Sequence, residues 1–453
     1  MHTFRLALLT LFIAAVAFAA APKEERALAW IRAYNEGAEA LEAFAAAHYA
    51  PATLARRTKE ERRAFHDRFS ATHGRFEVVR VTDQGIVVKA AKGATLTLEF
   101  DVEPQPPHRI ANVGIEMGDG QPATQLPPLS GLDALDDYMK KLVDADRFSG
   151  TVLVARNGQP LFERAYGMAS RRYSVPNRNT TRFSVGSITK DFTKVAIAQL
   201  AQAGKLKLTD TIATHLPDYP NQEVARKVTI EQMLEHRSGL GDIFTPRFFG
   251  VGKANFHRPS DFIQFFASDP LHFEPGQGQR YSNYGYTVLG AIIEAITKES
   301  YFDSIQKNVF DRASMSGSGF FDLELPTPDV AMGHTKVLAN GEQGKEWREI
   351  MARRYSVRGI PAGGSYSNAR DLLAFDRAMR AGKLADETWT RWFYGGDPKG
   401  SAVLAGGSPG VNAVLASDGT WTVVVLANVD PGLPEDLGEH IFKSLAAGGS
   451  PAR

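Results

Sequence analysis

The sequence predicts a mixed α/β (α+β) protein: an antiparallel sheet flanked by helices, with a helical region, preceded by a small α+β domain. Two turn pairs, Asn157-Gly158 and Asp418-Gly419, each stand between apolar runs, and such pairs are a strong signal for a β-hairpin. Between these hairpins the apolar spacing is mainly helical. The N-terminal part instead shows helices followed by short strand-like runs. At 453 residues, two domains are expected.

The first residues, Met1 to Ala21, have the pattern of a secretory signal peptide. Arg5 supplies the positive charge, Leu6 to Ala17 the apolar core, and Ala17-Phe18-Ala19 a cleavage site of small-x-small type. The alternative is an uncleaved membrane anchor, but the apolar run is shorter than the ~20 residues that a spanning helix needs. We therefore expect cleavage, no stable membrane span afterwards, and a periplasmic or secreted protein.

The overall composition excludes several classes of function. The net charge is +1 and 43% of the residues are hydrophobic, so nothing favours binding to nucleic acid or to an anionic membrane. The chain has no cysteine, which excludes disulfides, a lipidated cysteine and thiolate chemistry. No His-Glu-x-x-His or similar metal-ligand spacing occurs. We expect neither a cofactor nor a metal.

Residues 22–127 form the expected accessory domain. Apolar spacing predicts a helix over Ala27 to Tyr49, and a mostly charged helix follows at about Lys59 to Ser70. Val79, Val81, Leu96 and Leu98 show the alternation of half-buried strands. The expected strands are Phe76 to Val81, Gly85 to Ala90, Ala94 to Val102 and Arg109 to Glu116. The domain offers no catalytic residue, so its candidate partner is a protein or the cell wall. A Gly- and Pro-rich linker, Gly118 to Pro128, ends it.

Residues 128–453 form the larger expected domain. It begins with a helix from Leu132 to Ala145 and closes with one from Glu435 to Leu445. The two hairpins are Gly150 to Arg156 with Pro160 to Tyr166, and Val411 to Ala416 with Thr420 to Asn428. We expect them to build one antiparallel sheet from both ends of the domain. A cleft is then expected between this sheet and the inserted helices.

Ser187 and Lys190 are the first candidate catalytic pair. The apolar spacing after Lys190 is helical and ends at Gly204, so the two side chains share one face of a helix. A serine hydroxyl is a weak nucleophile until a base takes its proton, and a lysine serves only if its pKa is lowered. The free N–H groups of a helix start suit an oxyanion. The alternative is a capping serine followed by a surface lysine.

Tyr281 and Asn283 are the second candidate pair. They stand two residues apart at the boundary between a loop and a helical run, where both can point into a cleft. A tyrosine near a cation can act as a base, and an asparagine amide can hold a substrate carbonyl. The alternative is a buried aromatic turn.

In the stretch Gly359 to Leu373, Ser367 is the expected N-cap of a helix with Asp371 in its first turn.

These motifs, in this order, resemble the penicillin-recognising serine hydrolases, in the branch of class C β-lactamases, D-alanyl-D-alanine carboxypeptidases and β-lactamase-like esterases. His236-Arg-Ser-Gly-Leu and Gly363-Gly-Ser-Tyr-Ser also match that branch, and the resemblance spans about Leu129 to Ala446. It implies that Ser187 is the acylated nucleophile and that Lys190 and Tyr281 transfer protons. It implies that Asn283 positions the substrate.

The third motif of that branch departs from its usual pattern. A Lys-Thr-Gly or His-x-Gly stretch is expected on the strand lining the cleft, and Leu404-Ala-Gly-Gly stands there instead. The resemblance implies that Gly407 supplies the second oxyanion N–H, which needs no side chain. Leu404 removes the cation that binds a substrate carboxylate. Arg280, Arg354 and Arg358 are candidates to replace it.

Ser408 is a second apparent nucleophile that we reject. Gly406-Gly-Ser-Pro-Gly410 matches the Gly-x-Ser-x-Gly elbow, in which the residue after the serine donates its N–H to the oxyanion. Here that residue is Pro409, which has no N–H.

The leading hypothesis is an exported serine hydrolase that acts through an acyl-enzyme on Ser187. Its substrate is a small ester, or an amide or peptide, and the Leu404 change favours esters over carboxylate-bearing β-lactams. The alternative is a penicillin-binding or non-catalytic sensor protein of the same fold.

Overall fold

Both hairpins that the turn residues predict are present in this computed structural model, and together they form one five-stranded antiparallel sheet in the order β13-β14-β15-β5-β6. The strands are β5 (Gly150–Arg156), β6 (Gln159–Tyr166), β13 (Ala402–Ser408), β14 (Val411–Ser417) and β15 (Trp421–Ala427). Strands from the two ends of the domain meet where β15 pairs with β5, from Trp421 opposite Arg156 to Ala427 opposite Gly150. The expected sheet is therefore confirmed.

The structure describes residues 21–54, 58–81, 85–92, 95–117, 131–251, 255–322, 325–338, 343–350, 357–398 and 400–446. The predicted signal segment up to residue 20, the linker Gly118 to Pro128, and Arg354 lie outside these residues. Within the described part, no helix is both long and apolar enough to cross a membrane.

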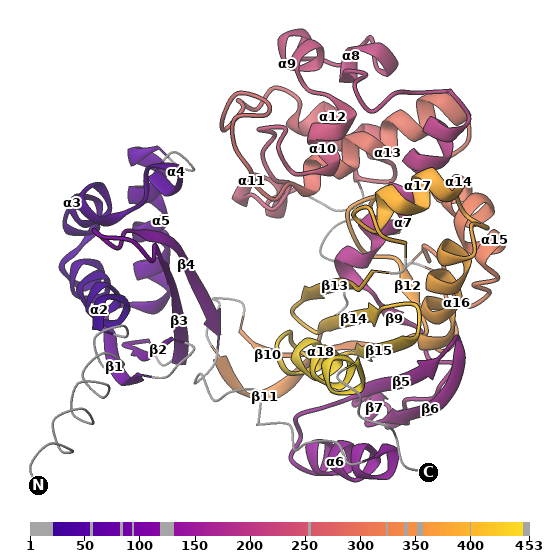
Figure 1. The fold of residues 1–453 in the computed structure, drawn as a ribbon, viewed down its shortest axis with the longest axis horizontal. Helices are drawn as coiled ribbons and strands as arrows, with labels where there is room; N and C mark the ends of the chain where they lie inside the picture. The colour runs from indigo at the N-terminus through magenta and orange to yellow at the C-terminus, as the bar shows by residue number, and fades with distance from the viewer. Residues whose placement is uncertain are drawn as a thin grey trace, which may run out of the picture. The chain divides into compact units, whose positions relative to one another are not determined.

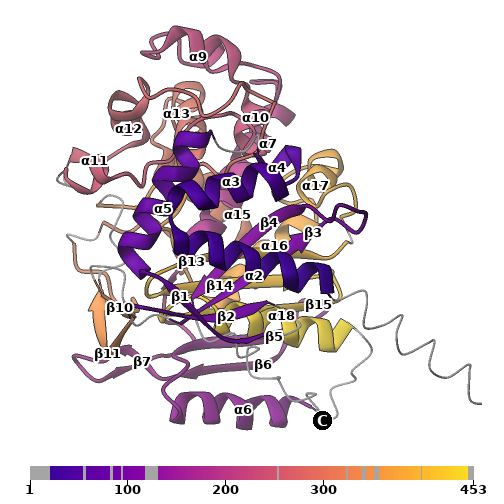
Figure 2. The ribbon, with the colours of Figure 1, turned by 90° about the vertical axis from the view of Figure 1, so that its left-hand side faces the viewer.

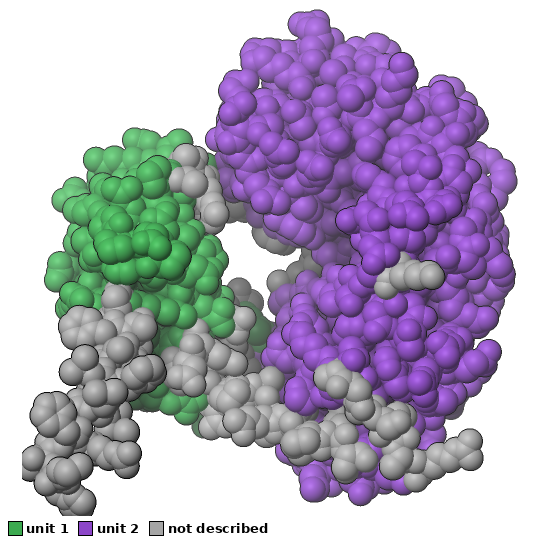
Figure 3. Space-filling view, in the orientation of Figure 1, with its two compact units in different colours: residues 1–124, 337–345 green, residues 125–336, 346–453 purple. Residues whose placement is uncertain are grey.

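The chain divides into two compact units, which Figure 3 colours separately. Residues 1–124 with 337–345 form the first unit, and residues 125–336 with 346–453 form the second. The expected boundary lies near residue 127, and the division falls after residue 124. The short segment 337–345, which we expected in the larger domain, groups with the first unit.

In the first unit, helices pack on one face of a four-stranded antiparallel sheet, β1-β2-β3-β4 (Figure 2). Its elements are α2 (Ala21–Glu36), α3 (Ala38–His48), α4 (Pro51–Leu54), α5 (Lys59–His73), β1 (Phe76–Val81), β2 (Ile86–Ala90), β3 (Thr95–Val102) and β4 (Ile110–Met117). The core includes Trp30, Tyr34, Leu96 and Leu98.

Two expectations for this unit are wrong in detail. The single helix expected over Ala27 to Tyr49 breaks at Gly37, which has a φ of 126° and precedes α3. Only glycine adopts such a φ readily. Val79 and Val81 are exposed instead of alternating with buried positions; β1 is an edge strand of the sheet, and its register against β2 shifts between Val78 and Arg80. A bulge of this kind changes the direction in which the following side chains point.

In the second unit, helices cover both faces of the sheet (Figure 1). On one face, α6 (Leu132–Asp144) and α18 (Leu433–Ala446) pack against apolar side chains that include Val152 and Val425. On the other face, the core joins Leu153 and Leu415 to α7 (Thr189–Gln202) and α16 (Ala369–Arg380).

The remaining elements belong mainly to the helical region and short connecting strands. They are β7 (Met168–Ser170), β8 (Val175–Pro176), β9 (Phe183–Ser184), η1 (Gly186–Ile188), α8 (Ile212–His215), α9 (Gln222–Lys227), α10 (Ile230–Leu234), α11 (Pro246–Phe249), α12 (Pro259–Phe266), α13 (Asn283–Thr297), α14 (Tyr301–Ile305), η3 (Gln306–Phe310), α15 (Asp311–Ala313), β10 (Gly333–Val337), β11 (Gln343–Ile350), β12 (Tyr366–Ser367) and α17 (Glu387–Phe393).

The expected N-cap of α16 is also wrong. Ser367 is the last residue of β12, which pairs with β9, and Asn368 caps α16 by accepting the N–H of Asp371. Ser367 instead shares a hydrogen bond with Ser318 at 2.8 Å. Pairing with β9 extends the strand by one residue and so moves the cap.

Candidate active site

Ser187 lies on a tight turn between β9 and α7. The turn is the 3-10 helix η1, and Gly186 within it has a φ of 52°. A side chain at Gly186 would come 2.9 Å from the carbonyl carbon of Gly406, and one at Gly406 would come 2.5 Å from the Ser187 nitrogen. Glycine at both positions therefore allows β13 to lie directly against the turn that carries Ser187.

The Ser187 hydroxyl is held between two side chains. Its Oγ lies 2.7 Å from the Tyr281 hydroxyl and 3.2 Å from the Lys190 Nζ. Lys190 is one turn further along the chain, and Tyr281 comes from the loop before α13. Both are within reach of a proton leaving Ser187. Of the sequence-predicted residues, these three meet at the Ser187 hydroxyl.

Lys190 is buried among neutral acceptors. Besides Ser187, its Nζ donates to the Asn283 Oδ1 at 2.8 Å and to the Ala362 carbonyl at 2.5 Å. The amine also lies over the Tyr281 and Tyr286 rings. The residue is 4% exposed. Burial lowers the pKa of Lys190 to about 7, against the raising effect of Asp242 and Asp191. Near neutral pH a large share of the amine is therefore unprotonated.

Asn283 connects Lys190 to Asp242, which the sequence reasoning missed. The Asn283 Nδ2 donates to the Asp242 carboxylate at 3.0 and 3.2 Å, while its Oδ1 faces Lys190. The Asn283 amide is thus held between these two residues. Asp242 follows the His236-Arg-Ser-Gly-Leu stretch, but its separation of 41 residues from Asn283 offered no local signal.

His236 supports the loop that presents Tyr281. The two ring centroids are 4.4 Å apart, and the His236 Nδ1 accepts the backbone N–H of Ser282 at 3.2 Å. Burial, with the nearby charge of Lys190, lowers the pKa of His236 to about 4. The ring is therefore neutral at neutral pH and keeps Nδ1 as an acceptor. The sequence marked this histidine only as part of a matching segment.

The stretch from Gly359 to Ser367 supports the serine from the other side. The Ser365 carbonyl accepts the Val185 N–H at 3.0 Å, and the Ser365 hydroxyl bonds to Thr189 at 2.7 Å. Because Ala362, in the same stretch, accepts from Lys190, this segment bonds to Val185 before the turn and to Thr189 and Lys190 within it.

Leu404 lies on the side of β13 that faces the serine turn. Side chains two apart share a face of a strand, so Leu404 and Gly406 point the same way, and Leu404 packs on the core that contains α7. The Gly407 nitrogen lies 3.0 Å from where a Gly186 side chain would be, beside the serine turn.

Two of the arginines considered as replacements, Arg280 and Arg358, have contacts with other groups. The Arg280 guanidinium bonds to the His272 Nδ1 at 2.7 Å, and Arg358 lies over the Phe302 ring with a centroid distance of 4.9 Å. Neither of these contacts involves Ser187, Lys190 or Tyr281.

Ser408 does not have the surroundings of a nucleophile elbow. It ends β13 opposite Val411, and Pro409-Gly410 turn the chain into β14. The elbow needs a helix after the serine, whereas a strand follows here.

A family comparison agrees with this geometry. Residues 135–447 match the Beta-lactamase family model, so the chain belongs to the Beta-lactamase family. The putative penicillin-binding protein PbpX of Bacillus subtilis is 27% identical over 308 residues, covering 65% of this chain and 73% of that protein. Other curated relatives are matched over smaller shares of their length. The match covers 37% of Protein flp of Staphylococcus aureus and 55% of penicillin-binding protein 4* of Bacillus subtilis.

Solved structures show the same fold. A penicillin-binding protein from Bacillus halodurans aligns with a TM-score of 0.59 at 27% identity, covering 68% of this chain and 99% of the other. A class C β-lactamase aligns with a TM-score of 0.57 at 18% identity, covering 71% and 97%. The second unit thus has the fold of the penicillin-recognising serine hydrolases.

Proposed function

We propose that this chain is a serine hydrolase that forms an acyl-enzyme on Ser187 and prefers small neutral esters. The observation that carries the proposal is the placement of the Ser187 Oγ 2.7 Å from Tyr281 and 3.2 Å from Lys190. A serine becomes an effective nucleophile when a neighbouring base takes its proton. With a pKa of about 7, Lys190 can supply that base near neutral pH.

The hydrogen-bond partners of Lys190 suit a neutral amine. A neutral lysine has two N–H groups and one lone pair. Asn283 and Ala362 each offer an acceptor to Nζ, so the two N–H groups are used there. The lone pair is then left for the third direction, toward the Ser187 hydroxyl.

Acylation follows from this arrangement. The Ser187 Oγ attacks the ester carbonyl carbon while its proton passes to Lys190, directly or through the Tyr281 hydroxyl. The carbonyl electron pair moves onto oxygen, then returns as the bond to the leaving alcohol breaks, and the alcohol takes the proton. A water molecule repeats these steps on the acyl-serine and releases the acid.

The oxyanion formed in this step needs hydrogen-bond donors. The backbone N–H of Ser187 at the start of the helix is one candidate, and the N–H of Gly407 is the second. The two glycines that bring β13 against the turn support this pairing. Removing one such donor typically costs ~10²–10³ in kcat.

Leu404 supports the preference for neutral substrates. An aliphatic side chain gives a substrate carboxylate no charge-assisted hydrogen bond, a contact that contributes roughly 1.5–3 kcal/mol. It also adds apolar surface on the serine side of β13, against which a neutral acyl group can pack.

The test begins with a fluorophosphonate probe on the full chain. We expect labelling at Ser187 and hydrolysis of short p-nitrophenyl esters faster than hydrolysis of nitrocefin. Absence of labelling on folded protein would rule out an activated serine. Labelling without ester, amide or β-lactam turnover would instead support the alternative of a penicillin-binding or sensor protein, for which the missing cation at Leu404 is the favouring observation.

A further inference from the structure

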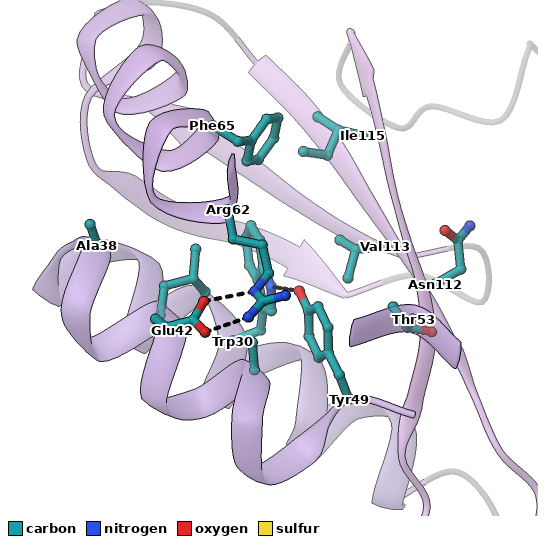
Figure 4. A pocket seen from close by; sticks show the side chains of 12 residues that line it. Trp30, Ala38, Glu42, Tyr49, Thr53, Arg62, Phe65, Asn112, Val113 and Ile115 are labelled. Atoms are coloured by element: carbon teal, nitrogen blue, oxygen red, sulfur yellow. Dashed lines mark hydrogen bonds and ion pairs between the residues drawn. The ribbon is translucent and has the colours of Figure 1, made fainter. Parts of the chain in front are cut away.

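The first unit contains a cavity that the hydrolase chemistry does not use. Its volume is about 330 Å³, and it lies among α2, α3, α4, α5 and β4 (Figure 4). The lining residues are Trp30, Ala38, Leu41, Glu42, Ala45, Tyr49, Thr53, Arg62, Phe65, Asn112, Val113 and Ile115. This volume lies at the lower end of the ~300–1,000 Å³ typical of small-molecule sites.

The wall combines apolar and aromatic side chains with one charged pair. The Arg62 Nε and Nη2 reach the two oxygens of Glu42 at 2.7 and 2.5 Å, and Nη1 donates to the Leu54 carbonyl at 3.0 Å. Trp30 donates its indole N–H to the Tyr49 hydroxyl at 2.7 Å. Figure 4 shows the pair beside Trp30 and Tyr49.

A charged pair in such a place is a poor source of stability. Its desolvation offsets its attraction, and apolar side chains of similar size often do as well or better. The Glu42 and Arg62 side chains are only 11% and 19% exposed. Stability alone therefore does not account for the pair, which gives the cavity a specific polar contact of the kind that small-molecule sites carry.

The pair also determines which ligand fits. Each Glu42 oxygen accepts one hydrogen bond from Arg62, and a carboxylate has about four acceptor positions, so Glu42 can accept a further donor. The two charges neutralise each other, so a charged ligand would be desolvated without a counter-charge. Trp30, Tyr49 and Phe65 offer aromatic surface.

We infer that this cavity binds an uncharged aromatic molecule that donates an N–H or O–H to Glu42. The site lies within the first unit and is independent of Ser187. A suitable probe is N-phenyl-1-naphthylamine, which is neutral, aromatic and fluorescent in apolar sites, and has one N–H. A matched probe is 1-phenylnaphthalene, which lacks that N–H.

The experiment is a fluorescence titration of the full chain with the first probe. We expect saturable binding that persists after Ser187 is blocked by a fluorophosphonate. Val113→Phe, which fills the cavity from β4, should weaken binding at least tenfold, whereas Val79→Phe, on the exposed part of β1, should leave it unchanged. Ala38→Leu is a second blocking variant in case Val113→Phe does not fold, judged by circular dichroism.

The donor is tested by displacement. In wild type, 1-phenylnaphthalene should bind several-fold more weakly than N-phenyl-1-naphthylamine, measured by its displacement of the fluorescent probe. In a Glu42→Met, Arg62→Met double variant, the two molecules should bind with equal affinity. No saturable binding, unchanged binding in a folded blocking variant, loss of binding when Ser187 is blocked, or equal affinity of both probes for wild type would each overturn the inference.

Discussion

Each unit of this protein contains a cationic side chain with little exposure to solvent, Lys190 in the second unit and Arg62 in the first, and the two differ in their partners. In the second unit Lys190 has neutral partners: its Nζ donates to Asn283 and Ala362 and lies 3.2 Å from the Ser187 hydroxyl, and burial lowers its pKa to about 7. In the first unit Arg62 faces the carboxylate of Glu42, whose hydrogen bonds raise the pKa of Arg62. Burial against neutral groups makes a cation able to lose its proton, whereas a direct carboxylate partner keeps it charged.

The predictions below test this contrast, starting with the largest effect. Ser187→Ala should abolish both fluorophosphonate labelling and ester hydrolysis, because the hydroxyl between Lys190 and Tyr281 is then missing. Ser408→Ala, at the end of β13, is the matched control and should leave both largely intact. Mass spectrometry of the labelled peptide checks the assignment, and labelling that follows Ser408 would show that the nucleophile is misassigned.

Lys190→Arg is the sharpest test of the contrast itself. Arginine keeps the positive charge but cannot lose its proton in a protein. If Lys190 acts as a base, the acylation rate should fall by about 10²–10⁴, as general-base loss predicts. The rate is measured in single-turnover labelling, with the exposed Lys207→Met as the control.

A Lys190→Arg variant that acylates at the wild-type rate would mean that a fixed charge is enough and that Tyr281 is the base. Tyr281→Phe then separates the two residues. It retains the ring beside His236 and loses only the hydroxyl that bonds Ser187 at 2.7 Å. We expect a loss in the same range of ~10²–10⁴, and near-normal acylation would remove Tyr281 from the mechanism.

Leu404 should control substrate charge with a smaller effect. Leu404→Lys or Leu404→His introduces a cation on the serine side of β13, so the ratio of kcat/KM for nitrocefin to that for a neutral ester should rise at least several-fold. Val403→Lys, on the opposite face of the same strand, is the matched control. An unchanged ratio in Leu404→His would show that this side chain does not meet the substrate.

The smallest effect concerns the pH profile. Asp242 raises the pKa of Lys190 by its charge. Asp242→Asn should therefore move the midpoint of the acylation rate toward lower pH, by up to about one unit. The rate itself should still rise with pH, because the unprotonated lysine is the active form. Asp269→Asn, in a surface pair with Arg247, should leave the midpoint in place. A shift to higher pH would contradict the assigned role of Asp242.

The sequence by itself determined the main sheet, the helix after Ser187 and the family, because these depend on local signals. Asn157-Gly158 and Asp418-Gly419 specify hairpins through their backbone preferences. Apolar spacing after Lys190 specifies α7. Residues three apart on a helical turn lie close together, so Ser187 and Lys190 could be paired from the sequence. The expected helix start at Ser187 differs from the structure, in which Ser187 lies in η1 and α7 begins at Thr189.

The tertiary structure decided what these residues can do. The acceptor that Ala362 offers to Lys190 is 172 residues away, and the carboxylate that holds Asn283 comes from a loop 41 residues earlier. A lysine pKa near 7 comes from burial by such distant segments, which no local pattern encodes. The cap at Asn368 likewise follows from the pairing of β12 with β9. The spacing of residues in the sequence therefore identified Ser187 and Lys190 as reactive groups, and packing against distant segments determined the pKa of Lys190.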